Sequence, residues 1–128
     1  MTTSNYKIAG HLPNAVGISQ GIPRGWKGRR CKALAPPWAL VKEPDPKRFN
    51  RLYGQQLAKL DPAAIAAELG PDAILLCWEK PGDYCHRRIV AKWLEKHLGI
   101  KVPEYEADVQ AINTPQQPTQ PLLSMSVT

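Results

Sequence analysis

The first 42 residues of this 128-residue chain contain neither aspartate nor glutamate, and the first acidic residue is Glu43. Over the whole chain, 17 lysines and arginines stand against 11 acidic residues, which gives a formal net charge of +6. The excess of positive charge therefore lies in the N-terminal third. Because cations gathered without compensating acids attract anions, we expect this part of the chain to contact an anionic partner.

Long apolar runs are also missing. No stretch approaches the roughly 18 apolar residues that span a bilayer, and residues 1–7 have no apolar core of the kind found in secretory signals. Three cysteines are an odd number, so a disulfide framework is not expected. These absences predict a cytoplasmic protein without a membrane partner. A hydrophobic content of 43% is ordinary for a globular domain.

The N-terminal cations are concentrated in residues 21–32, where glycines and a proline favour a loop. The basic side chains of this loop are Arg24, Lys27, Arg29, Arg30 and Lys32. Together with exposed backbone N–H groups they could bind phosphate, and Trp26 could stack on a base. The competing interpretation is a solvated basic loop whose tryptophan packs on the domain.

A second segment of interest begins with a short apolar run at 73–77. Gly-Pro and Pro-Gly pairs bound the run, which favours a strand buried on both faces. Apolar residues at helical spacing follow and predict an amphipathic helix over 84–98. Cys85, His86 and Arg87 would lie in its first turn. The carboxyl end of a strand is where α/β proteins bind ligands, and a helix N-terminus favours anions.

The remaining elements complete an alternation of strands and helices. Val16 and Ile18 predict a first strand within 14–20, and Asp-Pro pairs at 45–46 and 61–62 predict two helix starts. We therefore expect a small single-domain layered α/β fold, with a short, largely parallel sheet flanked by helices.

The two candidate segments, 21–32 and 79–88, share one edge of this sheet if their preceding strands are neighbours. We assign the domain to residues 1–106. Residues 107–128 are predicted to form a disordered tail, because 110–128 carry no charge and little patterned apolar surface.

The chain resembles the DUF488 family, a domain of unknown function. Its members show a strand ending in Leu-Leu-Cys-x-Glu, then Cys-His-Arg at a helix start; the matching residues here are Leu75, Leu76, Cys77, Glu79, Cys85, His86 and Arg87. Ile18-Ser19, Pro23, Trp26-Lys27-Gly28 and Leu34-Ala35-Pro36 are similar to the family's N-terminal half. The resemblance runs from about Asn5 to about Tyr105. It implies the fold and the position of the site, a bacterial or phage origin, and no particular activity.

Two classes of function fit these residues. The first is a hydrolase or a glycosyl-transfer enzyme acting on a nucleotide, nucleoside or nucleic-acid base. Glu79 would serve as nucleophile or general acid–base, with Cys85 beside His86 as an alternative nucleophile. Arg87 and the loop cations would bind phosphate, and Tyr84 would offer a hydroxyl or a stacking face. The alternative is a non-catalytic nucleic-acid or nucleotide-binding module that uses the 21–32 loop.

A metal site is the third hypothesis. The side chains that could bind zinc are Cys77, Cys85, His86, Glu79, His11 and Cys31. Their spacing matches no standard zinc motif, and adjacent helical ligands diverge by about 100°. We therefore expect no metal and no cofactor; the expected partner is a phosphate-bearing small molecule or a nucleic acid. Trp38 and Trp93 are expected in the core, and the sequence does not indicate an oligomeric state.

Overall fold

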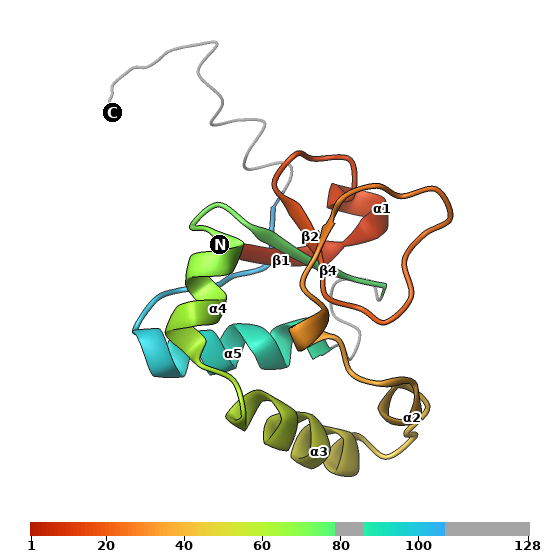
Figure 1. The fold of residues 1–128 in the computed structure, drawn as a ribbon, viewed down its shortest axis with the longest axis vertical. Helices are drawn as coiled ribbons and strands as arrows, with labels where there is room; N and C mark the ends of the chain where they lie inside the picture. Colours follow the sequence, from red (N-terminus) through yellow and green to blue (C-terminus); the bar gives the residue numbers. More distant parts are fainter. Residues whose placement is uncertain (79–85, 107–128) are drawn as a thin grey trace.

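The protein is built on one parallel sheet with helices on both faces (Figure 1). The computed structural model describes residues 1–78 and 86–106. The strands lie in the order β1-β4-β2-β3 and all pairs are parallel; their bounds are β1 Thr2–Asn5, β2 Ala15–Gly17, β3 Arg29–Arg30 and β4 Ile74–Cys77. The predicted α/β fold is confirmed. Because β2 pairs directly with β4, the segments that follow these two strands leave the sheet at the same edge.

Two of the helices begin at the predicted Asp-Pro pairs. Their bounds are α1 Tyr6–Ala9, α2 Trp38–Val41, α3 Pro46–Ala58, α4 Pro62–Leu69 and α5 His86–Leu98, with a 3-10 turn, η1, at Lys32–Leu34. The side chain of Asp45 caps α3 by accepting from the N–H of Lys47, and Asp61 caps α4 by accepting from Ala63. Helix α4 ends at Gly70, whose φ of 87° suits a residue without a Cβ.

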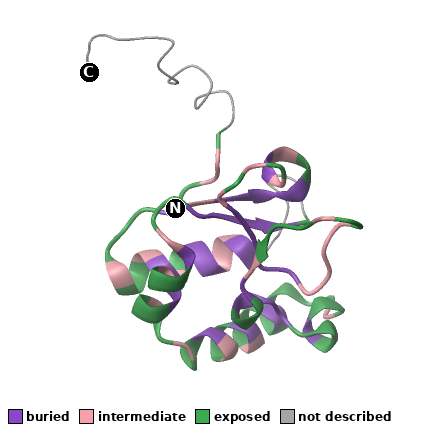
Figure 2. Ribbon diagram, turned by 45° about the horizontal axis from the view of Figure 1, so that its top comes forward, coloured by how far each residue is buried: buried purple, intermediate pink, exposed green. Residues whose placement is uncertain are grey.

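Both faces of the sheet are covered (Figure 2). Leu75 of β4 and Val16 of β2 pack in the larger core, together with apolar residues of α3, α4 and α5. Ile74 and Leu76 point to the opposite face, where they pack with Tyr6 of α1. The side chains alternate between the two cores, so β4 is buried on both faces, as its continuous apolar sequence predicts.

The loop after β2 and helix α5, which is the next described element after β4, lie on opposite faces of the sheet. After β2, the loop places Ile22 and Trp26 on the face covered by α1. Helix α5, which follows β4 in the chain order, packs on the other face. Adjacent strands whose continuations diverge in this way form a topological switch point, and the crevice beyond their carboxyl ends is the usual ligand position in parallel α/β folds.

Strand β1 was not predicted. Its sequence, Thr-Thr-Ser-Asn, has no apolar pattern, yet Thr3 and Ser4 are buried and β1 pairs with β4 along its length. The side chain of Asn5 then caps α1 by accepting from Ile8 N at 2.8 Å. On the C-terminal side of α5, Glu104 pairs with Thr3 in an isolated parallel bridge.

The predicted loop at 21–32 and the predicted C-terminal tail have different outcomes. Strand β3 lies inside the stretch predicted as a loop, since Arg29 and Arg30 pair with Val16 and Gly17. The predicted tail, 107–128, lies outside the described residues. Across residues 1–78 and 86–106, no helix has the length and apolar character needed to cross a membrane.

Candidate ligand-binding site

A pocket of about 190 Å³ lies at the switch point, beyond the carboxyl ends of β2 and β4. The loop after β2, the end of β4, the first residue of α5 and the segment around α2 and α3 form its walls; the lining residues are Ser19, Gln20, Gly21, Pro36, Trp38, Val41, Glu43, Phe49, Cys77, Trp78 and His86. Pockets for drug-sized ligands hold roughly 300–1,000 Å³. This one is therefore suited to a single ring system.

Hydrogen bonds fix the loop that forms one wall of the pocket. The hydroxyls of Tyr6 and Ser19 lie 2.6 Å apart, and Ser19 Oγ lies 2.6 Å from the carbonyl oxygen of Gly21. Because a carbonyl only accepts, Ser19 donates to Gly21 and Tyr6 donates to Ser19. Burial raises the pKa of Tyr6, although the hydrogen bond with Ser19 and the charge of Arg30 lower it. The phenol therefore keeps its proton at neutral pH.

Three of the predicted ligand-binding side chains bind the protein's own backbone instead. Arg30 Nη2 donates to the carbonyls of Ser19 at 3.2 Å and Gln20 at 2.8 Å, so it shapes the pocket wall. Arg29 donates to the carbonyls of Glu68 and Leu69 at the end of α4.

Trp26 is the third. Its Nε1 donates to the carbonyl of Gly10 at 2.8 Å, and its ring meets that of Tyr6 edge-on at 5.1 Å. This packing agrees with the competing interpretation of the loop, in which the tryptophan packs on the domain. Trp26 is not among the residues that line the pocket.

His86, a predicted site residue, does line the pocket and is neutral there. Its Nε2 lies 2.7 Å from the carbonyl oxygen of Ile18, so Nε2 carries the proton and donates. Burial lowers the pKa of His86 to about 4; the hydrogen bond to Ile18 raises it less, and the charge of Arg87 lowers it further. The ring also packs edge-on against Tyr53 at 5.4 Å. In this tautomer Nδ1 is a hydrogen-bond acceptor.

Two half-exposed tryptophans stand at the pocket. Trp38 is 54% exposed and Trp78 is 52% exposed, and both line it. Trp78 Nε1 donates to the carbonyl of Gly21 at 2.9 Å, and its ring centroid lies 5.1 Å from that of Tyr6. A Cβ placed on Gly21 would lie 3.3 Å from the ring of Trp38. Gly21 thus lies between the two indoles. The expectation that Trp38 lies in the core was wrong, because short helix α2 leaves it at the surface.

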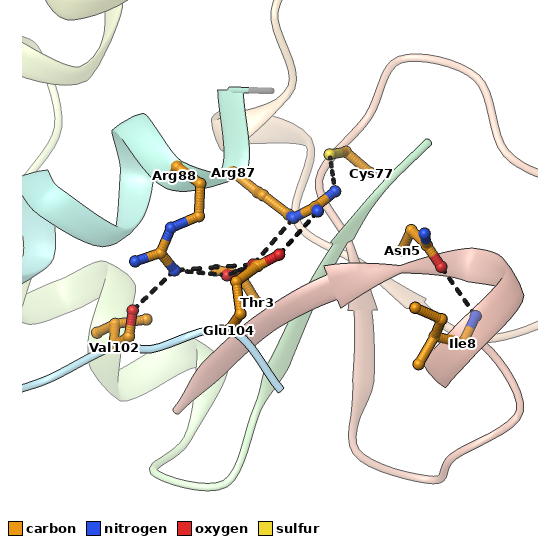
Figure 3. A network of polar contacts seen from close by, with 8 residues as sticks. All are labelled: Thr3, Asn5, Ile8, Cys77, Arg87, Arg88, Val102 and Glu104. Carbon is orange, nitrogen blue, oxygen red and sulfur yellow. Dashed lines mark hydrogen bonds and ion pairs between the residues drawn. The ribbon is translucent and has the colours of Figure 1, made fainter. Parts of the chain in front are cut away.

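Arg87, a predicted site residue, lies in a buried polar network (Figure 3). It is 1% exposed, and its Nε and Nη2 donate to the carboxylate of Glu104 at 3.1 and 2.8 Å. Its Nη1 donates to the sulfur of Cys77 at 3.1 Å. The guanidinium therefore lies in the protein interior, bonded to Glu104 and Cys77.

Glu104 is held as a carboxylate by this network. Burial alone would raise its pKa, but the hydrogen bonds from Arg87 and Thr3 and the charges of Arg87 and Arg88 outweigh burial and leave the pKa below its ordinary value. Arg88 completes the network by donating to Thr3 Oγ1 at 2.7 Å and to the carbonyl of Val102 at 2.9 Å. The network ties α5 to β1 and to the C-terminal segment.

The cysteines differ in state. Cys31 is free and buried, and burial raises its pKa, with Glu68 adding to the effect. Cys77 forms a disulfide, which corrects the expectation of reduced cysteines.

Three predicted site residues, Glu79, Tyr84 and Cys85, lie outside the described residues. In the part of the chain that the structure describes, no three or more His, Cys, Asp or Glu residues are grouped as a metal site.

The predicted cations Arg24 and Lys27 are exposed on the loop after β2, and neither lines the pocket. Glu43 is the one charged side chain among the described lining residues, and it pairs with Arg48 at 2.8 Å. The described walls therefore provide aromatic faces and neutral hydrogen-bonding groups, but no cation for a phosphate.

A comparison with protein families matches residues 9–98 to the model of the active DUF488-N3 subclade. The match covers most of the domain, including the loop after β2, β4 and α5. No curated protein and no solved structure matches the chain.

Proposed function

The chain belongs to the DUF488 family, and from its geometry we propose that it binds the base of a nucleotide or nucleoside at the carboxyl edge of the sheet. The observation that carries the proposal is the pair of half-exposed tryptophans, Trp38 and Trp78, on a pocket of about 190 Å³ at the switch point. An exposed indole that is held in place by a hydrogen bond offers a ready stacking face, and stacking on a base contributes about 1–3 kcal/mol.

The polar groups of the pocket suit the edge of a base. His86 is neutral and presents an acceptor at Nδ1, because Nε2 is used by the carbonyl of Ile18. Ser19 Oγ donates to Gly21 and accepts from Tyr6. A few polar groups in an otherwise apolar pocket orient a ligand without a large desolvation cost.

The experiment is a titration with the common nucleoside monophosphates and nucleosides, followed by calorimetry and by the indole N–H signals in NMR spectra. We expect the signals of Trp38 and Trp78 to move. Trp78→Ala should weaken binding about 5- to 150-fold, which corresponds to 1–3 kcal/mol of stacking.

Trp93→Phe is the matched control, because Trp93 lies on α5, pairs with His97 and does not line the pocket. It should bind like the unaltered protein. If no base-bearing ligand moves either indole signal, or if Trp78→Ala binds as tightly as Trp93→Phe, the proposal is wrong.

A second candidate function is hydrolysis or glycosyl transfer on the same ligand. The observation that favours it is His86, an imidazole that is neutral at physiological pH and lines the pocket. Glu79, which follows Trp78 in the chain, stays the predicted nucleophile or general acid–base. The test is release of free base, followed by chromatography; Glu79→Gln and His86→Asn should each abolish it. Binding without any release would instead support the non-catalytic module.

A further inference from the structure

We propose that the base recognised in the pocket belongs to a polynucleotide strand, whose phosphates lie on a basic surface beside the pocket. This inference rests on the proposed function and names its ligand class. The surface, called here the α1–loop surface, consists of Lys7 on α1 and of Arg24 and Lys27 on the loop after β2. All three side chains are exposed.

The first argument is that the aromatic rings line the pocket, whereas the cations lie outside it. The described walls of the pocket contain two indoles and no cation, and their charged member, Glu43, is negative. Glu43 is paired with Arg48, so a phosphate of the bound nucleotide would find no unpaired cation among the described wall residues. The cations lie outside, on the α1–loop surface. A ligand that uses both features must place its base and its phosphates in different places, as a strand does.

The second argument is the position of these cations relative to the pocket. A row of aromatic rings leads away from its rim: Trp78 lies 5.1 Å from Tyr6, and Tyr6 lies 5.1 Å from Trp26. Lys7 follows Tyr6 in the chain, and Lys27 follows Trp26. The hydrogen bond from Trp26 Nε1 to the carbonyl of Gly10 fastens the loop to the end of α1. Two of the three cations are therefore direct chain neighbours of rings in a row that begins at the pocket.

The third argument is that this charge is not neutralised locally. Residues 1–42 contain no acid, and the ion pairs of the described residues involve Arg48, Arg87 and Arg88 but none of the three cations of the α1–loop surface. Exposed cations without acidic partners are the electrostatic signature of a surface that binds phosphates.

The same surface suits nucleic acid better than an anionic membrane. A helix or loop that inserts into a bilayer presents large apolar side chains beside its cations. The exposed large apolar residues of the described chain are Trp38, Val41, Trp78 and Ile100, and none of them lies on α1 or on the loop at 22–28. Two of them stand instead at the base pocket.

The experiment measures binding of fluorescent 12-nucleotide single-stranded DNA and RNA by anisotropy, between 50 and 200 mM salt. Three phosphate contacts predict a slope of log affinity against log salt of about −2, which is about a 20-fold loss over this range. Arg24→Gln/Lys27→Gln should reduce the slope to about −0.7. Lys92→Gln/Lys96→Gln, which removes two exposed cations from α5, is the matched control and should keep the slope near −2.

Binding of a nucleoside monophosphate to the same variants separates the two proposals. We expect Arg24→Gln/Lys27→Gln to bind the mononucleotide almost normally, and Trp78→Ala to lose affinity for both ligands. If the strand binds no more tightly than the mononucleotide, or if both double variants weaken it equally, this inference fails and the base pocket stands. If Trp78→Ala leaves both affinities unchanged, the base pocket fails and the inference fails with it. Capture by anionic lipid vesicles but not by oligonucleotides would also overturn it.

Discussion

Replacing Arg87 with alanine should destabilise the fold, although the sequence predicts that this residue, in the first turn of α5, binds phosphate. The side chain is 1% exposed and makes two hydrogen bonds to Glu104 and one to Cys77. Arg87→Ala would leave the carboxylate without its main partner and would empty the volume of a fully buried side chain. Breaking a buried ion pair on one side costs about 3–5 kcal/mol.

The lower end of this range applies here. The side chain of Glu104 is 29% exposed, so water can solvate part of the orphaned charge. We therefore expect a loss of about 3 kcal/mol in the free energy of unfolding. With a urea m-value of about 1.5 kcal/mol/M, the midpoint of unfolding should fall by about 2 M. The assay is equilibrium unfolding in urea at pH 7, followed by far-UV circular dichroism.

Arg88→Ala is the matched control. Arg88 is the next residue on the same helix and also contacts Glu104, but at 3.8 Å, and its side chain is 34% exposed. Its removal should cost about 2 kcal/mol, because its hydrogen bonds to Thr3 and to the carbonyl of Val102 contribute about 1 kcal/mol each and the exposed pair contributes little. The reasoning is refuted if Arg87→Ala loses less than about 1 kcal/mol or no more than Arg88→Ala.

The remaining predictions concern the ionisation of His86 and the space around two glycines, Gly28 and Gly54. The pKa of His86 falls from 6.5 to about 4 on folding, so the unfolded chain takes up a proton first as the pH falls through 6.5. The free energy of unfolding should therefore fall by about 2 kcal/mol between pH 7.5 and pH 5. Urea unfolding of His86→Asn at the same pH values should not show this decrease. A Cβ at Gly28 would overlap the ring of Trp26, so Gly28→Ala should lower stability by about 1–3 kcal/mol and shift the tryptophan fluorescence. Gly54→Ala in α3, where a Cβ meets nothing within 4 Å, should instead stabilise the protein by about 0.5–1 kcal/mol; equal thermal shifts in the two variants would contradict the packing argument.

The sequence alone determined the elements whose signals are local. Asp45 and Asp61 cap their helices from within two residues, so each helix start could be read from a few positions. The apolar run at 73–77 predicted a strand buried on both faces, since no polar alternation was present. The loop after β2 and the segment after β4 were predicted to share an edge if their strands were neighbours, and the pairing of β2 with β4 met that condition.

Tertiary structure alone decided which polar side chains are buried. Strand β1 has no apolar pattern. Thr3 can be buried because its hydroxyl bonds to Glu104, 101 residues along the chain, and to Arg88, 85 residues along the chain. The same carboxylate draws Arg87 into the interior. Trp38 and Trp78 are exposed because Trp38 begins the short helix α2 and Trp78 follows the end of β4, both at the rim of the pocket. Local patterns cannot predict these outcomes, since the partners that satisfy or cover a side chain are brought together only by the fold.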